Sequence, residues 1–177
     1  AYDVLPSLLS ALSVDTETNP PWLFGHSDGG SISLLYAAKY PDQLSGAIVL
    51  APHIMVEAMT VSSIEQARVV YQQTNLREKL ARYHNDVDSA FWGWNDIWLN
   101  PDFLKWDITA ELENIRCPLL AVQGLDDEYG SLEQIRGIQR RLPHTGLLEL
   151  ADCGHSPHKD QAEALIATAR YFMRNHG

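Results

Sequence analysis

The sequence predicts an α/β fold: a mostly parallel sheet of about four strands, flanked by helices and interrupted by one helical insertion. Three observations predict it. Four short apolar runs are each bounded by turn residues. Segments with the periodicity of amphipathic helices separate these runs along the chain. The long stretch before the third run carries only helical patterns. At 177 residues, the chain is long enough to bury one core around such a sheet.

The four apolar runs are continuous rather than alternating, which is typical of strands covered on both faces. They predict strands over residues 21–27, 46–52, 118–124 and 145–151. Strands that alternate with helices form βαβ units, whose right-handed crossovers join parallel neighbours. The carboxyl ends of all four strands are therefore expected at one edge of the sheet.

Four helices are predicted around the sheet, over residues 2–12, 29–41, 131–143 and 160–175. The first is kinked or begins near Pro6, and the second ends at Pro41. Ser131 is the predicted N-cap of the third. Apolar stripes predict the buried faces of the last three helices: Ile32, Leu35 and Tyr36; Leu132, Ile135, Ile138 and Leu142; Ala164, Leu165, Thr168, Tyr171 and Phe172.

Residues 53–116 break the alternation and predict helices over residues 61–73, 75–84 and 87–99. The stretch holds four of the five tryptophans: Trp92, Trp94, Trp98 and Trp106. An aromatic insertion between two strands commonly covers a site as a lid. The alternative is that the rings pack these helices against the sheet, as aromatic residues do in ordinary cores. We predict a core of residues 1–52 and 117–177, with a Trp-rich lid or cap over 53–116.

Composition narrows the class of function. Thirteen basic and 23 acidic residues give a net charge of −10. This balance argues against nucleic acid or an anionic membrane surface as a partner. Two cysteines are too few for a disulfide framework, which favours a reducing, cytoplasmic location. The chain opens without a signal-peptide pattern, and no apolar stretch reaches the roughly 18 residues of a membrane helix.

Gly25, Ser27 and Gly29 form a G-x-S-x-G motif between a predicted strand and a predicted helix. A serine in such a strained turn is either a turn residue without chemistry or a nucleophile held out for attack. We expect a side chain at position 25 or 29 to collide with neighbouring backbone. The backbone N–H of Asp28, at the start of the helix, is the predicted oxyanion donor.

Two further loops carry groups that complete a serine nucleophile. "GLDDEYG", residues 124–130, places two carboxylates after the third strand, and "DCGHSPH", residues 152–158, places His155 after the fourth. A serine, an acid and a histidine then follow one another along the chain, each at the carboxyl end of a strand. All three are expected to converge at one edge of the sheet.

On these motifs the chain resembles the α/β-hydrolase superfamily, in particular its cytosolic esterase-like members. "GHSDGGS", "GLDDEYG" and "CGHSPH" carry the resemblance, which runs from residue 1 to about residue 175. It implies Ser27 as nucleophile, Asp127 as acid and His155 as base. Asp127 is preferred to Asp126 because the family usually places its acid three residues after the glycine of this loop, here Gly124. A serine at the centre of the G-x-S-x-G turn, called the nucleophile elbow in this family, argues against the branches of the superfamily that are associated with an aspartate nucleophile.

Neighbouring residues leave alternatives open. His26 lines the pocket or packs under the elbow as a helper, and His53 contacts substrate or is a polar loop residue. We include both among the predicted pocket residues, with Trp92, Trp94 and Trp98 of the insertion. Cys153 is expected to pack as a small buried residue. A metal cluster of Asp152, Cys153, His155 and His158 is disfavoured, because no zinc-type Cys/His pairing recurs elsewhere. No metal and no cofactor are predicted.

The resemblance also exposes a departure at the start of the chain. In the family, strands before the elbow carry the loop that supplies a second oxyanion N–H. Here one predicted helix precedes the nucleophile strand, so the first half of the sheet is expected to be absent. Losing one oxyanion donor costs about a hundred- to a thousandfold in rate. The strand near residues 21–26 becomes an uncharged sheet edge, which we predict pairs with a second copy to form a homodimer.

The leading functional prediction is a serine hydrolase of small-molecule carboxylic esters, with small or medium acyl chains. Two alternatives remain. A catalytically weak or silent chain would keep the fold and serve as an assembly or binding module. A third possibility keeps the same three residues but cleaves a carbon–carbon bond or a lactone.

Overall fold

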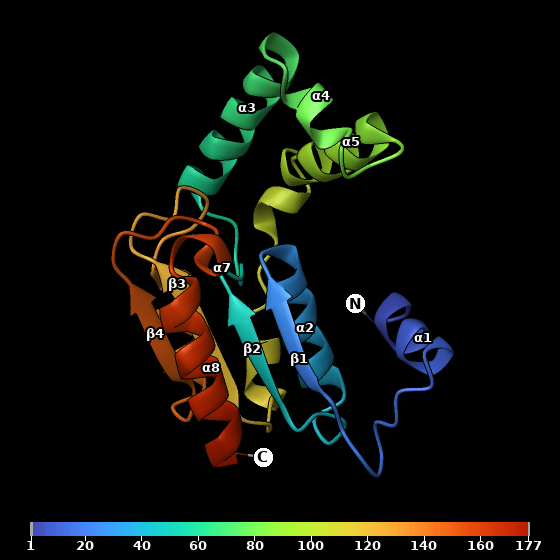
Figure 1. Cartoon of the computed structure of the whole chain (residues 1–177), viewed down its shortest axis with the longest axis vertical. Helices are drawn as coiled ribbons and strands as arrows, with labels where there is room; N and C mark the ends of the chain where they lie inside the picture. The colour runs from blue at the N-terminus through green and yellow to red at the C-terminus, as the bar shows by residue number, and fades with distance from the viewer. Residues whose placement is uncertain (1, 177) are drawn as a thin grey trace. The chain divides into compact units, whose positions relative to one another are not determined.

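The computed structural model describes residues 2–176, which divide into two compact units. The first unit contains the chain up to Ile54 and from Asp107 onward, and the second contains Met55–Trp106. The first holds the sheet, and the second is helical (Figure 1). Residues 107–116 belong with the sheet, where the short helix η2, Glu111–Asn114, packs against the helix that follows the first strand.

The sheet has four parallel strands in the order β1-β2-β3-β4. Their bounds are β1 Trp22–His26, β2 Gly46–Leu50, β3 Leu119–Gly124 and β4 Gly146–Leu150. Every residue of β2 and β3 is buried, as the continuous apolar runs predict. This arrangement confirms the predicted fold class. It also brings the carboxyl ends of all four strands to one edge, with β1 and β4 outermost.

Helices cover both faces of this sheet. Helix α8, Ala162–His176, lies over one face, and α2, Asp28–Lys39, packs on β1 and β2 from the other (Figure 1). The remaining helices of this unit are α1 Val4–Ala11, α6 Glu133–Arg141 and α7 Pro157–Asp160. Between α8 and the sheet lies a core of alternate strand residues and one helix stripe: Ile48, Leu50, Leu120, Val122, Leu150, Leu165, Ala169 and Phe172.

The predicted buried face of α2 is confirmed for Tyr36 and wrong for Ile32 and Leu35. Ile32 is 39% exposed, and Leu35 is half-buried. The helix instead buries a face rich in small residues: Gly30, Ser31, Ser33, Leu34, Tyr36 and Ala37. The hydroxyl of Ser31 donates to the His53 carbonyl at 2.6 Å, and that of Ser33 donates to the Gly29 carbonyl at 2.8 Å. Because both hydroxyls are satisfied, serine can be buried here without the usual desolvation cost.

Two other helix details differ from the sequence expectation. Helix α6 begins at Glu133 with Leu132 at the cap position, although the Ser131 hydroxyl still accepts a bond from the Glu133 N–H at 3.2 Å. In α8, Leu165 and Phe172 are buried as expected, but Tyr171 is 72% exposed. A separate turn, α7, precedes α8 and shortens it, and the inward stripe is Leu165, Ala169 and Phe172.

The second unit folds around its own aromatic residues. Its helices are α3 Ala58–Gln73, α4 Leu76–Leu80, α5 Val87–Trp98 and η1 Phe103–Lys105. The rings of Tyr71 and Phe91 stack with centroids 3.8 Å apart, and Val87 completes this cluster. Buried Trp98 packs edge-on against Phe103 and Trp106. A lid function for this unit stays a prediction.

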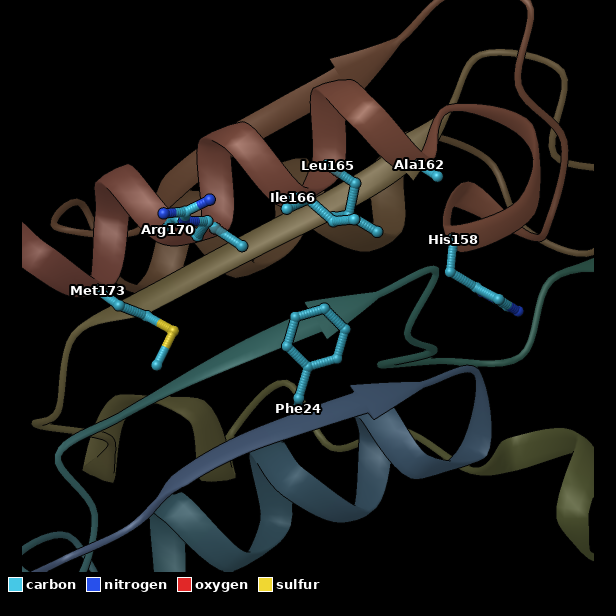
Figure 2. Close-up of a pocket in the computed structure, with 8 residues that line it drawn as sticks. Phe24, His158, Ala162, Leu165, Ile166, Arg170 and Met173 are labelled. Carbon is cyan, nitrogen blue, oxygen red and sulfur yellow. The ribbon is translucent and has the colours of Figure 1, made fainter.

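An apolar groove of about 230 Å³ runs between β1 and α8 (Figure 2). Its lining residues are Phe24, His158, Ala162, Leu165, Ile166, Ala169, Arg170 and Met173. Phe24 points from the outer strand into the groove and is 56% exposed, which is high for a phenylalanine. Among residues 2–176, no helix is long and apolar enough to cross a membrane.

Candidate active site

Ser27 stands in the sharp turn between β1 and α2. Its backbone has φ 54° and ψ −123°, a strained conformation for a residue with a side chain, and its N–H donates to the Leu50 carbonyl at 2.9 Å. A Cβ at Gly25 would lie 2.2 Å from the Gly29 carbonyl oxygen, so glycine is required there. The same expectation for Gly29 is wrong, because a Cβ at that position would meet nothing within 4 Å.

A chain of hydrogen bonds connects Ser27 with the two other residues of the predicted triad. The Ser27 Oγ lies 2.9 Å from His155 Nε2. On the other side of the imidazole ring, His155 Nδ1 lies 2.9 Å and 3.0 Å from the two carboxylate oxygens of Asp127. The side chains of His155 and Asp127 are 14% and 1% exposed. The structure therefore brings an alcohol, an imidazole and a buried carboxylate into one contiguous path.

The carboxylate of Asp127 is held by further N–H donors. Its Oδ1 accepts from the backbone N–H of Tyr129 at 2.9 Å, and its Oδ2 accepts from the amide of Gln123 at 3.2 Å. Gln123 is fully buried in β3 and also donates to the Gly130 carbonyl at 2.7 Å. Asp126, in contrast, is exposed, and its N–H donates to the Cys153 carbonyl at 3.0 Å. Of the two carboxylates, Asp127 is the one that contacts His155, and its role as the acid stays a prediction.

The loop that carries His155 approaches the acid loop very closely. A Cβ at Gly124 would lie 2.0 Å from the Cys153 carbonyl oxygen, so only glycine fits at this end of β3. The N–H of His155 donates to a carboxylate oxygen of Glu128 at 3.3 Å, and the N–H of Gly154 donates to Asp160 at 3.0 Å. The close approach at Gly124 and the bond to Glu128 fix the histidine loop against the loop that holds Asp127, and the bond to Asp160 ties it to α7.

Two other histidines lie beside this path. The Nε2 of His26 is 2.7 Å from the His155 carbonyl oxygen, and the His26 ring packs between those of His155 and His158. His53 is buried, with its Nε2 3.1 Å from the Tyr129 carbonyl oxygen and its ring 6.0 Å from that of His155. Burial lowers the pKa of both His26 and His53, because it disfavours the charged ring.

The other predicted site residues fall in two places. Asp28 is the first residue of α2, where backbone N–H groups have no acceptor within the helix. Trp92, Trp94 and Trp98 lie on α5 in the second unit, so a contact with substrate stays a prediction for them. Within residues 2–176, no three His, Cys, Asp or Glu side chains are arranged to hold a metal ion. Cys153 is buried, and burial raises the pKa of its thiol to about 11.

Sequence reasoning did not find three residues that contact the path: Gln123, Glu128 and Tyr129. For Gln123 a signal exists, because a single polar side chain inside an otherwise apolar buried strand needs a partner. Its proximity to "GLDDEYG" is then informative. Glu128 and Tyr129 belong to that same quoted loop, but loop conformation decides which of its side chains faces the histidine.

Comparison with protein families places this geometry in context. The sequence model of the alpha/beta hydrolase family matches residues 2–168. Among curated proteins, the chain is 24% identical over 193 residues to a 2-hydroxy-6-oxo-6-phenylhexa-2,4-dienoate hydrolase of Burkholderia cepacia, covering 95% of this chain and 66% of that one. A hydrolase of the same name from Comamonas testosteroni is also 24% identical, with 86% and 62% covered. The chain thus spans slightly less than two thirds of these relatives.

Solved structures share the fold. A thermophilic esterase from Thermogutta terrifontis superposes with a TM-score of 0.65 at 22% identity, covering 99% of this chain and 71% of the esterase. A membrane phospholipase A described as a bacterial virulence factor superposes with a TM-score of 0.74 at 20% identity, covering 97% and 61%. The described sheet and its helices therefore correspond to a part of these larger proteins.

Proposed function

This chain belongs to the alpha/beta hydrolase family, and we propose that it is a serine hydrolase of carboxylic esters. The observation that carries the proposal is the hydrogen-bonded path from Ser27 Oγ through His155 to Asp127. A serine hydroxyl is too weakly acidic to attack an ester at neutral pH without a base beside it. The path supplies that base and a buried carboxylate that orients it.

The proposed reaction has two halves. Ser27 Oγ attacks the ester carbonyl carbon while His155 Nε2 takes the hydroxyl proton, and the alcohol leaves with that proton as the acyl-enzyme forms. Water then attacks the acyl carbon, gives a proton to His155, and the acid leaves as Ser27 regains its hydrogen. Throughout, Asp127 accepts the His155 Nδ1–H bond and stabilises the imidazolium. The Asp28 N–H, at the amino end of α2, is proposed to donate to the oxyanion.

Solved relatives support the choice of an ester as substrate. One structural neighbour is an esterase, and another comes from work on carboxylesterases of Nitrososphaera gargenis. The two curated relatives favour a second candidate, because both are named hydrolases of 2-hydroxy-6-oxo-6-phenylhexa-2,4-dienoate, which is not an ester. Carbon–carbon bond cleavage by the same residues is therefore the second proposed activity.

A fluorophosphonate probe tests the nucleophile without knowledge of the natural substrate. We expect the probe to label the protein and p-nitrophenyl acetate to be hydrolysed, and Ser27→Ala to abolish both. Ser10→Ala, at an exposed serine of α1, is the matched control and is expected to behave as wild type. A folded protein that neither reaction touches would instead support the silent binding module. Comparing p-nitrophenyl esters with 2-hydroxy-6-oxo-6-phenylhexa-2,4-dienoate separates the two activities.

Three further features belong to the proposal. The Trp-rich second unit is proposed as a lid, with Trp92 and Trp94 as its half-buried candidates for substrate contact. A homodimer is proposed through the outer edge of β1, where uncharged residues and the exposed Phe24 lie. Both cysteines are buried and form no disulfide, which supports a reducing, cytoplasmic location.

A further inference from the structure

The proposed nucleophile and base come from opposite edges of the sheet. Ser27 follows β1 and His155 follows β4, and β2 and β3 lie between these strands. Three strand spacings of about 4.8 Å separate β1 from β4, which makes ~14 Å. The loop after β4 therefore has to cross the ends of both inner strands before His155 can reach Ser27. A loop that spans this distance needs contacts that hold it near Ser27 as well as contacts that hold it near β3 and β4.

The loop that carries His155 is held by several contacts with the acid loop after β3. Cys153 accepts from the Asp126 N–H, and Gly124 lets the two loops touch. Glu128 accepts from the His155 N–H at 3.3 Å. All of these contacts tie the histidine loop to the acid loop after β3, so they align His155 with Asp127. None of these three contacts involves β1, and their geometry leaves the distance from the imidazole to Ser27 to be set by something else.

Near Ser27, the side chain of the preceding residue, His26, contacts the backbone of His155. His26 is the last residue of β1, and its Nε2 lies 2.7 Å from the His155 carbonyl oxygen. The carbonyl can only accept, so the imidazole donates this bond. Ring packing fixes the orientation of His26: its centroid lies 5.1 Å from that of His155 and 4.8 Å from that of His158.

We propose that His26 is a positioning residue that anchors the His155 backbone to the nucleophile strand and so sets the separation of Ser27 Oγ and His155 Nε2. This inference rests on the proposed function of Ser27 and His155. A rigid strand end gives the anchor little freedom, because residue 26 is fixed by the parallel pairing of β1 with β2. The lowered pKa of the His26 ring agrees with a neutral imidazole, and the contact with the His155 carbonyl oxygen assigns its one proton to Nε2.

Two amide substitutions separate the hydrogen bond from mere polarity. In glutamine the side-chain nitrogen is four bonds from Cα, the same distance as Nε2 in histidine. In asparagine it is three bonds away, the distance of Nδ1. His26→Gln therefore keeps a donor within reach of the His155 carbonyl, whereas His26→Asn keeps the same chemistry but falls short. His144→Asn, at an exposed histidine before β4, is the control for histidine loss alone.

The rate of fluorophosphonate labelling and the hydrolysis of p-nitrophenyl acetate are measured for each variant. A base displaced by about 1 Å can lose on the order of a hundredfold in rate. We expect His26→Asn to lose ~100-fold in kcat with little change in KM, and His26→Gln and His144→Asn to stay close to wild type. Equal labelling and hydrolysis rates in His26→Asn and His26→Gln would overturn the proposal that His26 positions His155. Absence of labelling in the wild type would instead refute the proposed function itself.

The wild-type protein offers a test that needs no variant. Long-range proton–nitrogen NMR of the imidazole rings reports which nitrogen of a neutral histidine is protonated. We expect the proton of His26 on Nε2, with the through-bond signature of donation to a carbonyl. A His26 ring protonated only on Nδ1 has no hydrogen to donate to His155, and this result would overturn the proposal even if a variant failed to fold.

Discussion

Ser27 is held in a backbone conformation that few residues with a side chain adopt. Its φ of 54° costs roughly 1–3 kcal/mol, which the surrounding structure has to offset. The Leu50 carbonyl accepts its N–H, and Gly25 lets the start of α2 lie directly against β1. The strain thus aims one hydroxyl at the imidazole of His155, and the two flanking glycines contribute unequally to this geometry.

The inequality of the two glycines gives a matched pair of substitutions. Gly25→Ala forces a Cβ to within 2.2 Å of backbone, so we expect it to lower the free energy of unfolding by roughly 2–3 kcal/mol. Gly29→Ala adds a Cβ to open space inside the first turn of α2. Alanine is the better helix former, so this variant is expected to gain about 0.5–1 kcal/mol.

Urea denaturation of the two variants, followed by circular dichroism, measures both free energies. Equal losses in the two variants would contradict the unequal roles of the glycines. Nothing in the motif itself distinguishes them, because G-x-S-x-G is symmetric about its serine. The difference arises from the close approach of α2 to β1, which depends on the tertiary packing.

At the level of single residues, the sequence predicted the members of the hydrogen-bonded path but not what holds them. Chain order and position after a strand indicated Ser27, His155 and a carboxylate in the loop 124–130, and the resemblance to the family pointed to Asp127 within that loop. The bond from His26 to the His155 backbone could not be predicted, because a carbonyl acceptor has no signature in the sequence. The contact of Gln123 with Asp127 was missed for a similar reason: it depends on a loop that turns back over its own strand.

Among the elements, β1 is exceptional because it forms an edge of the sheet although its residues are uncharged. A flat apolar edge is a template for pairing with another strand. Phe24 adds a half-exposed ring above the groove between β1 and α8 (Figure 2). The edge strand and the groove meet at Phe24, the exposed residue of β1.

The homodimer prediction is tested at this strand. We expect the wild type to scatter light as a dimer at micromolar concentration, because pairing of two β1 edges satisfies their outer hydrogen-bonding groups. Phe24→Lys places a charge on the edge and is expected to give a monomer. Tyr171→Lys replaces a still more exposed aromatic residue of α8, 72% against 56% for Phe24, that lies outside the groove, and it should leave the dimer intact. A monomeric wild type would remove the prediction.

Helices show where periodicity predicts well and where it fails. The stripe of α6 predicted buried Ile135 and Ile138, because large aliphatic residues dominate that face. In α2, Leu34 and Tyr36 are buried, but so are Ser31 and Ser33, whose hydroxyls are satisfied. Burial of small polar residues needs particular backbone acceptors, here the carbonyls of His53 and Gly29. A rule that seeks only large apolar residues therefore cannot find the serine part of this face.

For the molecule as a whole, the buried His53 and the half-buried His26 couple stability to pH. The pKa values of His26 and His53 are lowered below the ordinary 6.5 by burial. The electrostatic effect of His155 also lowers the pKa of His53, whereas the carboxylates of Asp28 and Asp127 raise it. Between these lowered values and pH 6.5 the unfolded chain binds more protons than the folded one. The free energy of unfolding therefore falls as the pH is lowered through this window.

We expect the urea midpoint to be lower at pH 5.5 than at pH 7.5, with a limiting slope of about 1.4 kcal/mol per pH unit for each proton. His53→Gln keeps a donor for the Tyr129 carbonyl but does not titrate, so it should reduce this difference. His84→Gln, at an exposed histidine of the second unit, is the control and should not. A midpoint that stays constant or rises on acidification would contradict the lowered pKa values of the His26 and His53 rings.

At this scale, the sequence predicted the parallel sheet, its strand positions and the family, and all three are confirmed. Continuous apolar runs between helical segments leave few alternatives to a parallel sheet. The function of the second unit cannot be predicted from the sequence in the same way. Tryptophans pack a helical unit and line a substrate pocket with the same rings, so the pattern alone does not separate the two roles.

Neither Ser27 nor His155 follows one of the two inner strands, β2 and β3. These strands nevertheless set the distance between the strand ends from which Ser27 and His155 come. An additional strand between β1 and β4 would keep Ser27, Asp127 and His155 in the chain but would move Ser27 and His155 apart by about 4.8 Å. Backbone pairing alone supplies this span, because hydrogen-bonded strands lie about 4.8 Å apart whatever side chains they carry.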